Sequence, residues 1–174
     1  MMAFISPLPI ALCESSMTAS TSSLTFIHCS PQTIAERLER TRWANDFSWT
    51  QILLLGQYFK LYSADAGCEL FQEGDSGQSM GIVLTGTIDI TKQGKLIEQL
   101  KIGRTYGEMS LIDNQPRSAS AIVHEACEVL VMERAMLLQL SEHNPKLAFN
   151  LLWKVAAFLS QNLRKTSGHL ADFL

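Results

Sequence analysis

The sequence predicts a mainly β domain, a barrel, roll or sandwich, with helices before and after it. Between residues 61 and 132, short apolar runs alternate with polar residues, which places successive side chains on opposite faces of strands. Gly, Asp and Asn residues separate these runs at the close spacing typical of an all-β fold. The period of the apolar residues becomes helical on both flanks. With 174 residues, the chain has the length of one compact domain with tails.

The first 29 residues are predicted to be a disordered leader. Residues 1–13 are apolar, but they lack a basic stretch, and Pro7 and Pro9 interrupt them, which argues against a signal peptide. A Ser/Thr-rich run at residues 15–23 also favours disorder. We therefore expect three parts: the leader 1–29, helices and strands over 30–142, and a C-terminal helix and tail over 143–174.

Two helices are expected before the strands. Ser30 is a good N-cap with Pro31 at the first helical position, and the apolar pattern continues to about Arg42. Ser48 is the predicted cap of a second helix, whose apolar residues extend to Phe59.

The strands and the last helices follow in order. Met80–Leu84 and Thr87–Ile90 read as two strands, and Gln93–Lys95 reads as a hairpin tip. A short helix is expected over Glu133–Ser141. A longer helix is expected from Pro145, with Asn144 as its cap, to about residue 166.

Composition excludes several classes of protein. Hydrophobic residues make up 47% of the chain and charged residues 18%, which is globular, and the net charge of -3 gives no general attraction to DNA. Neither the four cysteines nor the four histidines have the spacing of a metal site, so we expect no metal and reduced thiols in the cytoplasm. No apolar stretch is long enough to span a membrane.

The stretch that indicates chemistry is Tyr106–Ala121. Gly107 permits a sharp turn and a close approach of the backbone to a ligand. Glu108–Leu111 looks like one helical turn whose N–H groups favour an anion. Arg117 offers a planar guanidinium suited to a phosphate, and Ser118 adds a hydroxyl group. Because a carboxylate repels a phosphate, we expect Glu108 to accept from a sugar hydroxyl and to pair loosely with Arg117.

The alternative is a charged loop with an incidental salt bridge, but the pieces occur together and in order. The stretch resembles the phosphate-binding cassette of the cyclic-nucleotide-binding domain family, which includes catabolite-activator-type regulators and regulatory subunits of cAMP-dependent protein kinase. Tyr106–Met109 and Pro116–Ala119 fit the two ends of that cassette. Upstream, Leu70–Asp75 and Met80–Ile90 also fit the family pattern. The resemblance extends over about residues 47–166.

The resemblance implies an eight-stranded jelly-roll-like β-roll, or double-stranded β-helix, with N-terminal helices and a long C-terminal helix. The ligand would be cAMP or cGMP, with Glu108 on the ribose 2′-hydroxyl, Arg117 on the phosphate, and Ser118 on the phosphate or base. Backbone N–H groups near Met109 and Ser110 would complete the site. The candidate binding residues are Gly107, Glu108, Met109, Ser110, Arg117, Ser118, Ala119 and Asn162.

Asn162 is included among the candidate binding residues because of the pattern of the last helix. Ala148, Leu152, Val155 and Leu159 follow one another at the coiled-coil step, and continuing that step reaches Asn162. In the regulators that the chain resembles, this helix forms a dimer seam and a polar residue on it touches the purine. Asn162 is therefore expected either to read the base or only to set the register of a homodimer. A monomer whose helix packs on its own barrel would show the same pattern.

These observations favour a sensor for a cyclic nucleotide, cAMP in the first place, which acts through its last helix on a second subunit or an effector protein. A catabolite-activator-type transcription regulator is the alternative, but the sequence stops where the DNA-binding domain of such proteins begins, so we expect no DNA binding. A degenerate module that binds no nucleotide is disfavoured by the intact Glu108 and Arg117. No nucleophile–base pair or metal cluster accompanies the site, so we do not expect an enzyme.

Overall fold

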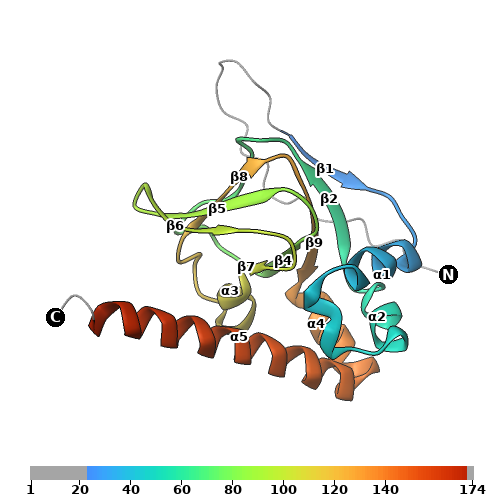
Figure 1. Ribbon diagram of the computed structural model, residues 1–174. Coiled ribbons are helices and arrows are strands. Elements are labelled where there is room, and N and C mark those ends of the chain that lie inside the picture. Colours follow the sequence, from blue (N-terminus) through green and yellow to red (C-terminus); the bar gives the residue numbers. More distant parts are fainter. Residues whose placement is uncertain (1–22, 172–174) are drawn as a thin grey trace.

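The computed structural model describes residues 23–171, and of residues 166–171 it describes only the helical backbone. Two antiparallel sheets form a roll, with helices packed at one end and a long helix along one side (Figure 1). The predicted fold class is confirmed. The strands are β1 (Leu24–Ile27), β2 (Lys60–Ala64), β3 (Glu69–Phe71), β4 (Ser79–Val83), β5 (Thr87–Lys92), β6 (Lys95–Leu100), β7 (Thr105–Tyr106), β8 (Ser120–Glu125) and β9 (Cys127–Glu133).

The eight strands β2 to β9 make the roll that the resemblance implied, and β1 is added at one edge. The first sheet has the order β1-β2-β9-β4-β7, and the second has the order β3-β8-β5-β6. β1 pairs antiparallel with β2 from Leu24 opposite Ala64 to Ile27 opposite Leu61.

The leader predicted to extend to residue 29 is therefore too long, because residues 24–27 form a strand. This strand forms by pairing with β2. The sequence around residues 24–27 did not predict it, because the pairing joins segments far apart in the chain. The rest of the predicted leader, residues 1–22, lies outside the described residues.

The N-terminal helices begin where the sequence predicts, but they end earlier. Ser30 and Ser48 cap α1 (Pro31–Glu39) and α2 (Trp49–Leu55) with their side chains. A separate 3-10 helix, η1 (Arg42–Asp46), begins at the residue where the first helix was predicted to end. α2 stops at Gly56, where a Cβ would lie 2.3 Å from the carbonyl oxygen of Pro31 at the start of α1.

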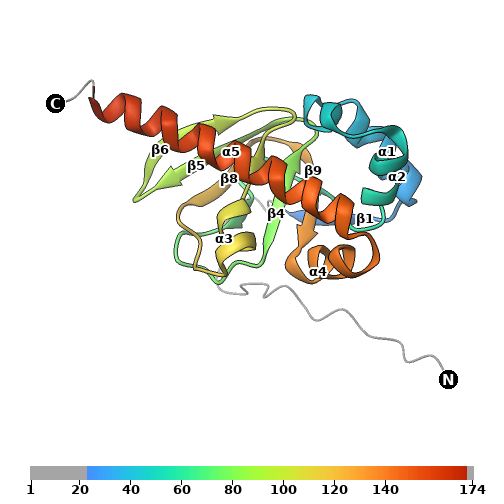
Figure 2. The same cartoon turned by 90° about the horizontal axis from the view of Figure 1, so that it is seen from below.

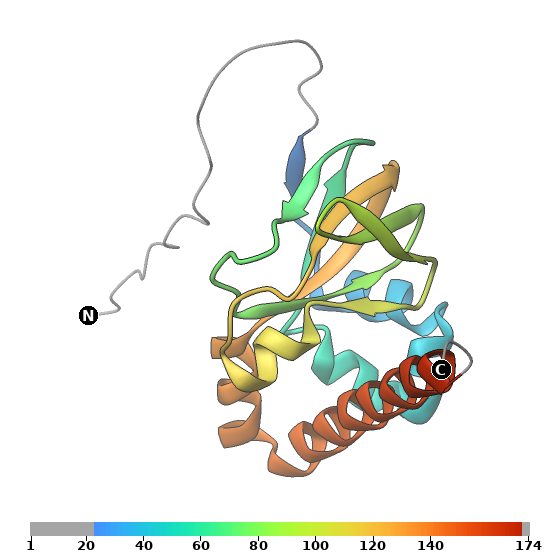
Figure 3. The same ribbon diagram turned by 90° about the vertical axis from the view of Figure 1, so that its left-hand side faces the viewer.

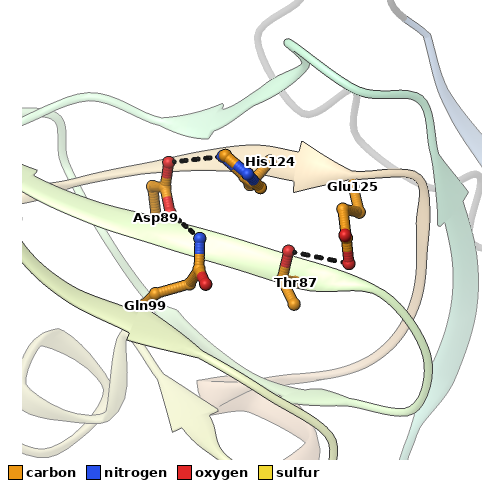
Figure 4. A network of polar contacts seen from close by, with 5 residues as sticks. All are labelled: Thr87, Asp89, Gln99, His124 and Glu125. Atoms are coloured by element: carbon orange, nitrogen blue, oxygen red, sulfur yellow. Dashed lines mark hydrogen bonds and ion pairs between the residues drawn. The ribbon is translucent and has the colours of Figure 1, made fainter.

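The second sheet illustrates how alternation separates core from surface. Ile88 in β5 is fully buried. Its neighbours Thr87 and Asp89 point to the other face and hydrogen-bond across the sheet (Figure 4). Asp89 accepts from Gln99 at 2.9 Å and contacts His124 at 3.0 Å. This outer face is therefore a polar network.

The chain ends in α4 (Arg134–His143) and α5 (Pro145–Ala171), and α5 runs the length of the roll on one side (Figure 2). No helix among the described residues is long and apolar enough to cross a membrane. α3 (Glu108–Asp113) lies on the side of the roll that faces α5 (Figures 1 and 3).

The dimer seam predicted on α5 is not a single exposed face. Ala148 and Val155 are buried in the protein's own core, Leu159 packs partly against that core, and Leu152 is exposed. The large apolar residues that α5 turns to solvent are Phe149, Leu152, Trp153 and Leu163. The periodicity was right for a helix with one buried stripe, but the stripe is buried in a core that helices and strands of the same chain form together.

Candidate functional site

The site begins with the turn that leads from β7 into α3. Gly107 caps α3 in the left-handed conformation, with a φ of 73°. A Cβ at this position would lie 2.4 Å from Nη1 of Arg117 and 2.9 Å from the carbonyl oxygen of Ser79. Glycine is therefore required here both for the backbone angle and to leave room for the arginine.

Arg117 is buried, with 7% of its surface exposed, and its guanidinium is held firmly in place. Nη1 donates to the carbonyl oxygens of Ser79 at 2.7 Å and Gly107 at 3.0 Å, and Nη2 donates to Ser79 Oγ at 2.9 Å. The ring of Phe71 lies 4.1 Å from Cζ. Burial lowers the pKa of Arg117 from its ordinary value, yet an arginine stays charged at neutral pH.

These contacts leave one edge of the guanidinium unused. Both hydrogens of Nη1 and one hydrogen of Nη2 are engaged, whereas Nε is buried without a hydrogen-bond partner. Nε–H and the second hydrogen of Nη2 lie side by side along one edge of the planar group. Such an edge is the fork that binds two oxygens of a phosphate or carboxylate.

The loop after β3 supports the arginine from behind. Gly74 N donates to the carbonyl oxygen of Arg117, and Arg117 N donates to that of Asp75, both at 2.8 Å. At Gly77, a Cβ would lie 2.4 Å from Nε of the arginine. The Leu70–Asp75 motif thus positions the backbone and side chain of Arg117.

Glu108, at the start of α3, is the second buried charged group, with 8% of its surface exposed. Burial raises the pKa of its carboxyl group, its own backbone N–H lowers that pKa, Glu98 raises it, and Arg104 and Arg117 lower it. Its Oε2 has no hydrogen-bond partner.

The loose ion pair expected between Glu108 and Arg117 is an electrostatic interaction at a distance and not a direct hydrogen bond. The side chain of Arg117 donates hydrogen bonds to Ser79 and to the carbonyl of Gly107, and its charge acts on Glu108 through space.

All eight candidate residues line one cavity of about 830 Å³. Their surroundings differ: Ser110 is buried, Met109 and Ser118 are exposed, and Asn162 is half-buried. Ser118 Oγ donates to the sulfur of Met109 at 3.6 Å. The structure therefore brings α3, the segment 117–119 and the last helix together around one space.

Sequence reasoning missed several residues of this site. Ser79 anchors Arg117, and Phe71 and Gly77 pack against the guanidinium. The apolar wall and the mouth add residues from β5, β6 and α5: Ile90, Lys92, Ile97, Glu98, Phe158 and Lys165. Phe71 and Ile90 belonged to motifs that the sequence singled out, whereas the others are common residue types in ordinary loops, strands and helices.

The described residues contain no group of three or more His, Cys, Asp or Glu side chains placed to hold a metal ion. The chemistry of the cavity is that of an anion-binding fork, an acceptor carboxylate and apolar walls.

Comparisons with known proteins show which family this chain resembles. Residues 62–144 match the family described as Cyclic nucleotide-binding domain. The Cyclic AMP receptor protein of Thermus thermophilus is 34% identical over 113 residues, which are 62% of this chain and 50% of that protein. The chain thus spans about half the length of this curated relative.

Two solved structures share the fold. A cyclic nucleotide-binding domain from Methylobacillus flagellatus superimposes with a TM-score of 0.76 at 28% identity, over 87% of this chain and 89% of the other. The Catabolite Activator Protein of Thermus thermophilus gives 0.65 at 29% identity, over 75% of this chain and 62% of the other. The expected resemblance is confirmed: most of the β-roll and helix α4, residues 62–144, match the cyclic nucleotide-binding domain family.

Proposed function

We propose that this chain is a regulatory module that binds a 3′,5′-cyclic nucleotide, cAMP in the first place, in the cavity beside α3. One observation carries the proposal. Two charged side chains of opposite sign, each more than nine-tenths buried, line the same cavity and keep hydrogen-bonding atoms without partners. Leaving such atoms unpaired costs about 1–3 kcal/mol each, so the pair is best explained by a ligand that has both an anionic and a hydroxyl group.

The free edge of Arg117 fits the cyclic phosphate. Its other donors are fixed on Ser79 and Gly107, so the fork is held in place before a ligand arrives. A preorganised donor loses little conformational entropy on binding. The backbone N–H groups at the start of α3, at Met109 and Ser110, add donors close to the same phosphate, and Ser118 adds a hydroxyl.

Glu108 fits the ribose. Its orphan Oε2 would accept a hydrogen bond from the 2′-hydroxyl, which is the donor nearest to a 3′,5′-cyclic phosphate. A carboxylate in that place also disfavours a doubly charged 5′-phosphate, which carries more negative charge than the cyclic diester.

The base would lie between the apolar wall of β6 and the last helix. Ile97 and Phe158 supply apolar surface there, and Asn162 supplies an amide that can pair with either purine. The name of the Thermus relative, Cyclic AMP receptor protein, supports adenine.

The signal would pass through α5. Phe158, Asn162 and Lys165 belong to this helix and also line the cavity, so a ligand would contact α3 and α5 together. Binding energy can then favour one position of the helix over another. The chain would act by binding rather than by catalysis, and the free thiols of Cys29, Cys68 and Cys127 support a reducing cytoplasm.

Calorimetry with cAMP, cGMP and 5′-AMP tests the proposal. We expect cAMP to bind more tightly than cGMP and both to bind more tightly than 5′-AMP. Arg117→Ala should weaken cAMP binding by about 2–4 kcal/mol, and Arg117→Lys should recover only part of that loss, because an ammonium group cannot form the fork. Wild-type affinity in a folded Arg117→Ala variant would refute the assignment.

We also propose that two copies pair through the outward face of α5. Phe149 and Trp153 stack on each other at 6.0 Å and are mostly exposed, and Leu152 and Leu163 continue the same helix face. Dimers that pair through a helix usually do so along a long exposed apolar stripe of this kind. Leu152→Glu should shift the wild-type sedimentation profile from dimer to monomer, whereas a monomeric wild-type protein at high concentration with cAMP bound would exclude this dimer.

A further inference from the structure

A second cavity, of about 890 Å³, lies beside the nucleotide cavity and between η1, the turn from β6 to β7, and α5. We call it the basic groove. The two cavities share Thr105 and Phe158 in their walls. No role in the proposed nucleotide site uses its other side chains.

The floor of the basic groove is aromatic. Trp43 and Phe47 stack with their ring centres 5.3 Å apart, and both are buried. Lys154 lies over the two rings, at 5.5 Å and 5.8 Å, and forms an ion pair with Asp46. This arrangement offers a hollow with apolar surface and a fixed cation.

The walls of the groove carry an excess of positive charge. Four basic side chains line it, and Asp46 is its one acidic residue among those described. Lys154 pairs with Asp46, and Arg104 pairs with Glu98 at 2.8 Å. Arg42 and Lys101 are exposed and have no acidic partner among the residues whose side chains the structure describes. In a chain with a net charge of -3, this is a local basic patch.

Large apolar side chains stand exposed beside these cations. Trp153 lines the groove with 67% of its surface exposed, and Ile102 lines it with 59% exposed. Exposed Trp and Arg residues around a hollow are typical of the energetic centre of a protein interface.

We propose that the basic groove binds an acidic segment of a partner protein. Two carboxylates of the segment would face Arg42 and Lys101, and one apolar side chain would enter the hollow beside Ile102. This inference rests on the proposed function, because a sensor module needs a partner that reads its state. The unpaired charges identify the chemistry of that partner, and the hollow gives it an anchor.

The geometry also couples the groove to the nucleotide cavity. Arg104 lines the groove and pairs with Glu98, which lines the nucleotide cavity. The same guanidinium lies 5.0 Å from the ring centre of Phe158, a residue that lines both. A nucleotide that moves Glu98 or Phe158 therefore changes the wall of the groove, and by linkage the partner segment changes nucleotide affinity by the same factor.

The test uses a random 12-residue peptide library displayed on phage and selected on the full chain with saturating cAMP. We expect enriched peptides to be acidic and to contain a large apolar residue. The best peptide should bind about 10-fold more weakly or worse to Lys101→Glu and to Arg42→Glu, because each change turns an attraction into a repulsion. Lys95→Glu is the matched control, because Lys95 is an exposed cation at the first residue of β6, whereas Lys101 directly follows its last residue. This variant should bind the peptide as wild type does.

The outcomes separate this proposal from the nucleotide site. Calorimetry with cAMP should give wild-type affinity for Lys101→Glu and Arg42→Glu, so a failed nucleotide site would be seen independently. The affinity of the peptide should change about fivefold or more when cAMP is added, the range of ordinary allosteric coupling. The proposal is overturned if no acidic peptide is enriched, if Lys95→Glu weakens the peptide as much as Lys101→Glu, or if a single-stranded oligonucleotide of thymidines displaces it from the groove.

Discussion

Three glycine-to-alanine changes separate the backbone cost of the site from its effect on the arginine. Gly94 and Gly107 have nearly the same left-handed φ, 75° and 73°. A Cβ at Gly94 meets no atom within 4 Å, whereas one at Gly107 would lie 2.4 Å from Nη1 of Arg117. At Gly77, where φ is not left-handed, a Cβ would lie 2.4 Å from Nε. The three positions therefore represent strain alone, strain with a clash, and a clash alone.

The expected magnitudes follow from these contacts. Gly94→Ala should cost about 1–2 kcal/mol of stability, the penalty for an L-residue in the left-handed region, and should leave cAMP affinity unchanged. Gly107→Ala adds the displacement of Arg117 from the carbonyl oxygens of Ser79 and Gly107. Losing one such charge-assisted bond costs about 1.5–3 kcal/mol, so the total should reach about 2.5–5 kcal/mol. Gly77→Ala should show the cost of displacing Arg117 without the cost of a left-handed backbone.

Thermal unfolding and calorimetry measure the two effects. Each kcal/mol lowers Tm by about 2–4 °C in a domain of this size. Gly77→Ala and Gly107→Ala should both bind cAMP about 10- to 100-fold more weakly, since the phosphate fork has moved. If Gly107→Ala loses no more stability than Gly94→Ala and binds cAMP like wild type, the arginine is not held as described.

Four further outcomes are expected. Glu108→Gln should weaken cAMP binding much more than binding of 2′-deoxy-cAMP, and equal losses would mean that Glu108 does not contact the 2′-hydroxyl. Because burial raises the pKa of Glu108, ionisation costs stability as pH rises, so Glu108→Gln should raise Tm at pH 7, and the gain should vanish below the ordinary pKa of 4.5. Asn162→Ala should lower cAMP affinity by about 1–2 kcal/mol without changing the sedimentation coefficient if the amide reads the base. Anisotropy measurements with duplex DNA at physiological salt should show no sequence-selective binding, since the chain has a net charge of -3.

Local chemistry in the sequence determined where the helices begin and which stretch forms the site. Ser30 and Ser48 cap helices because a side-chain oxygen can satisfy a free N–H three residues ahead, a contact that depends on neighbours only. The site could be found in the same way, because Gly107–Glu108 and Pro116–Ser118 are close neighbours in the sequence and form a recognisable local motif. Asn162 was reached from the helical period, and the structure places it in the wall of the same cavity.

Tertiary packing decided the rest, because it depends on contacts between segments far apart in the chain. β1 exists by pairing with β2, and α2 ends where Gly56 meets Pro31. Ser79 became the anchor of Arg117 although 38 residues separate them. The period of α5 predicted one buried stripe, but only the structure shows that other helices and strands of the chain cover it and that Phe149 and Trp153 are mostly exposed. A one-dimensional pattern gives the face of a helix; which surface buries that face is settled in three dimensions.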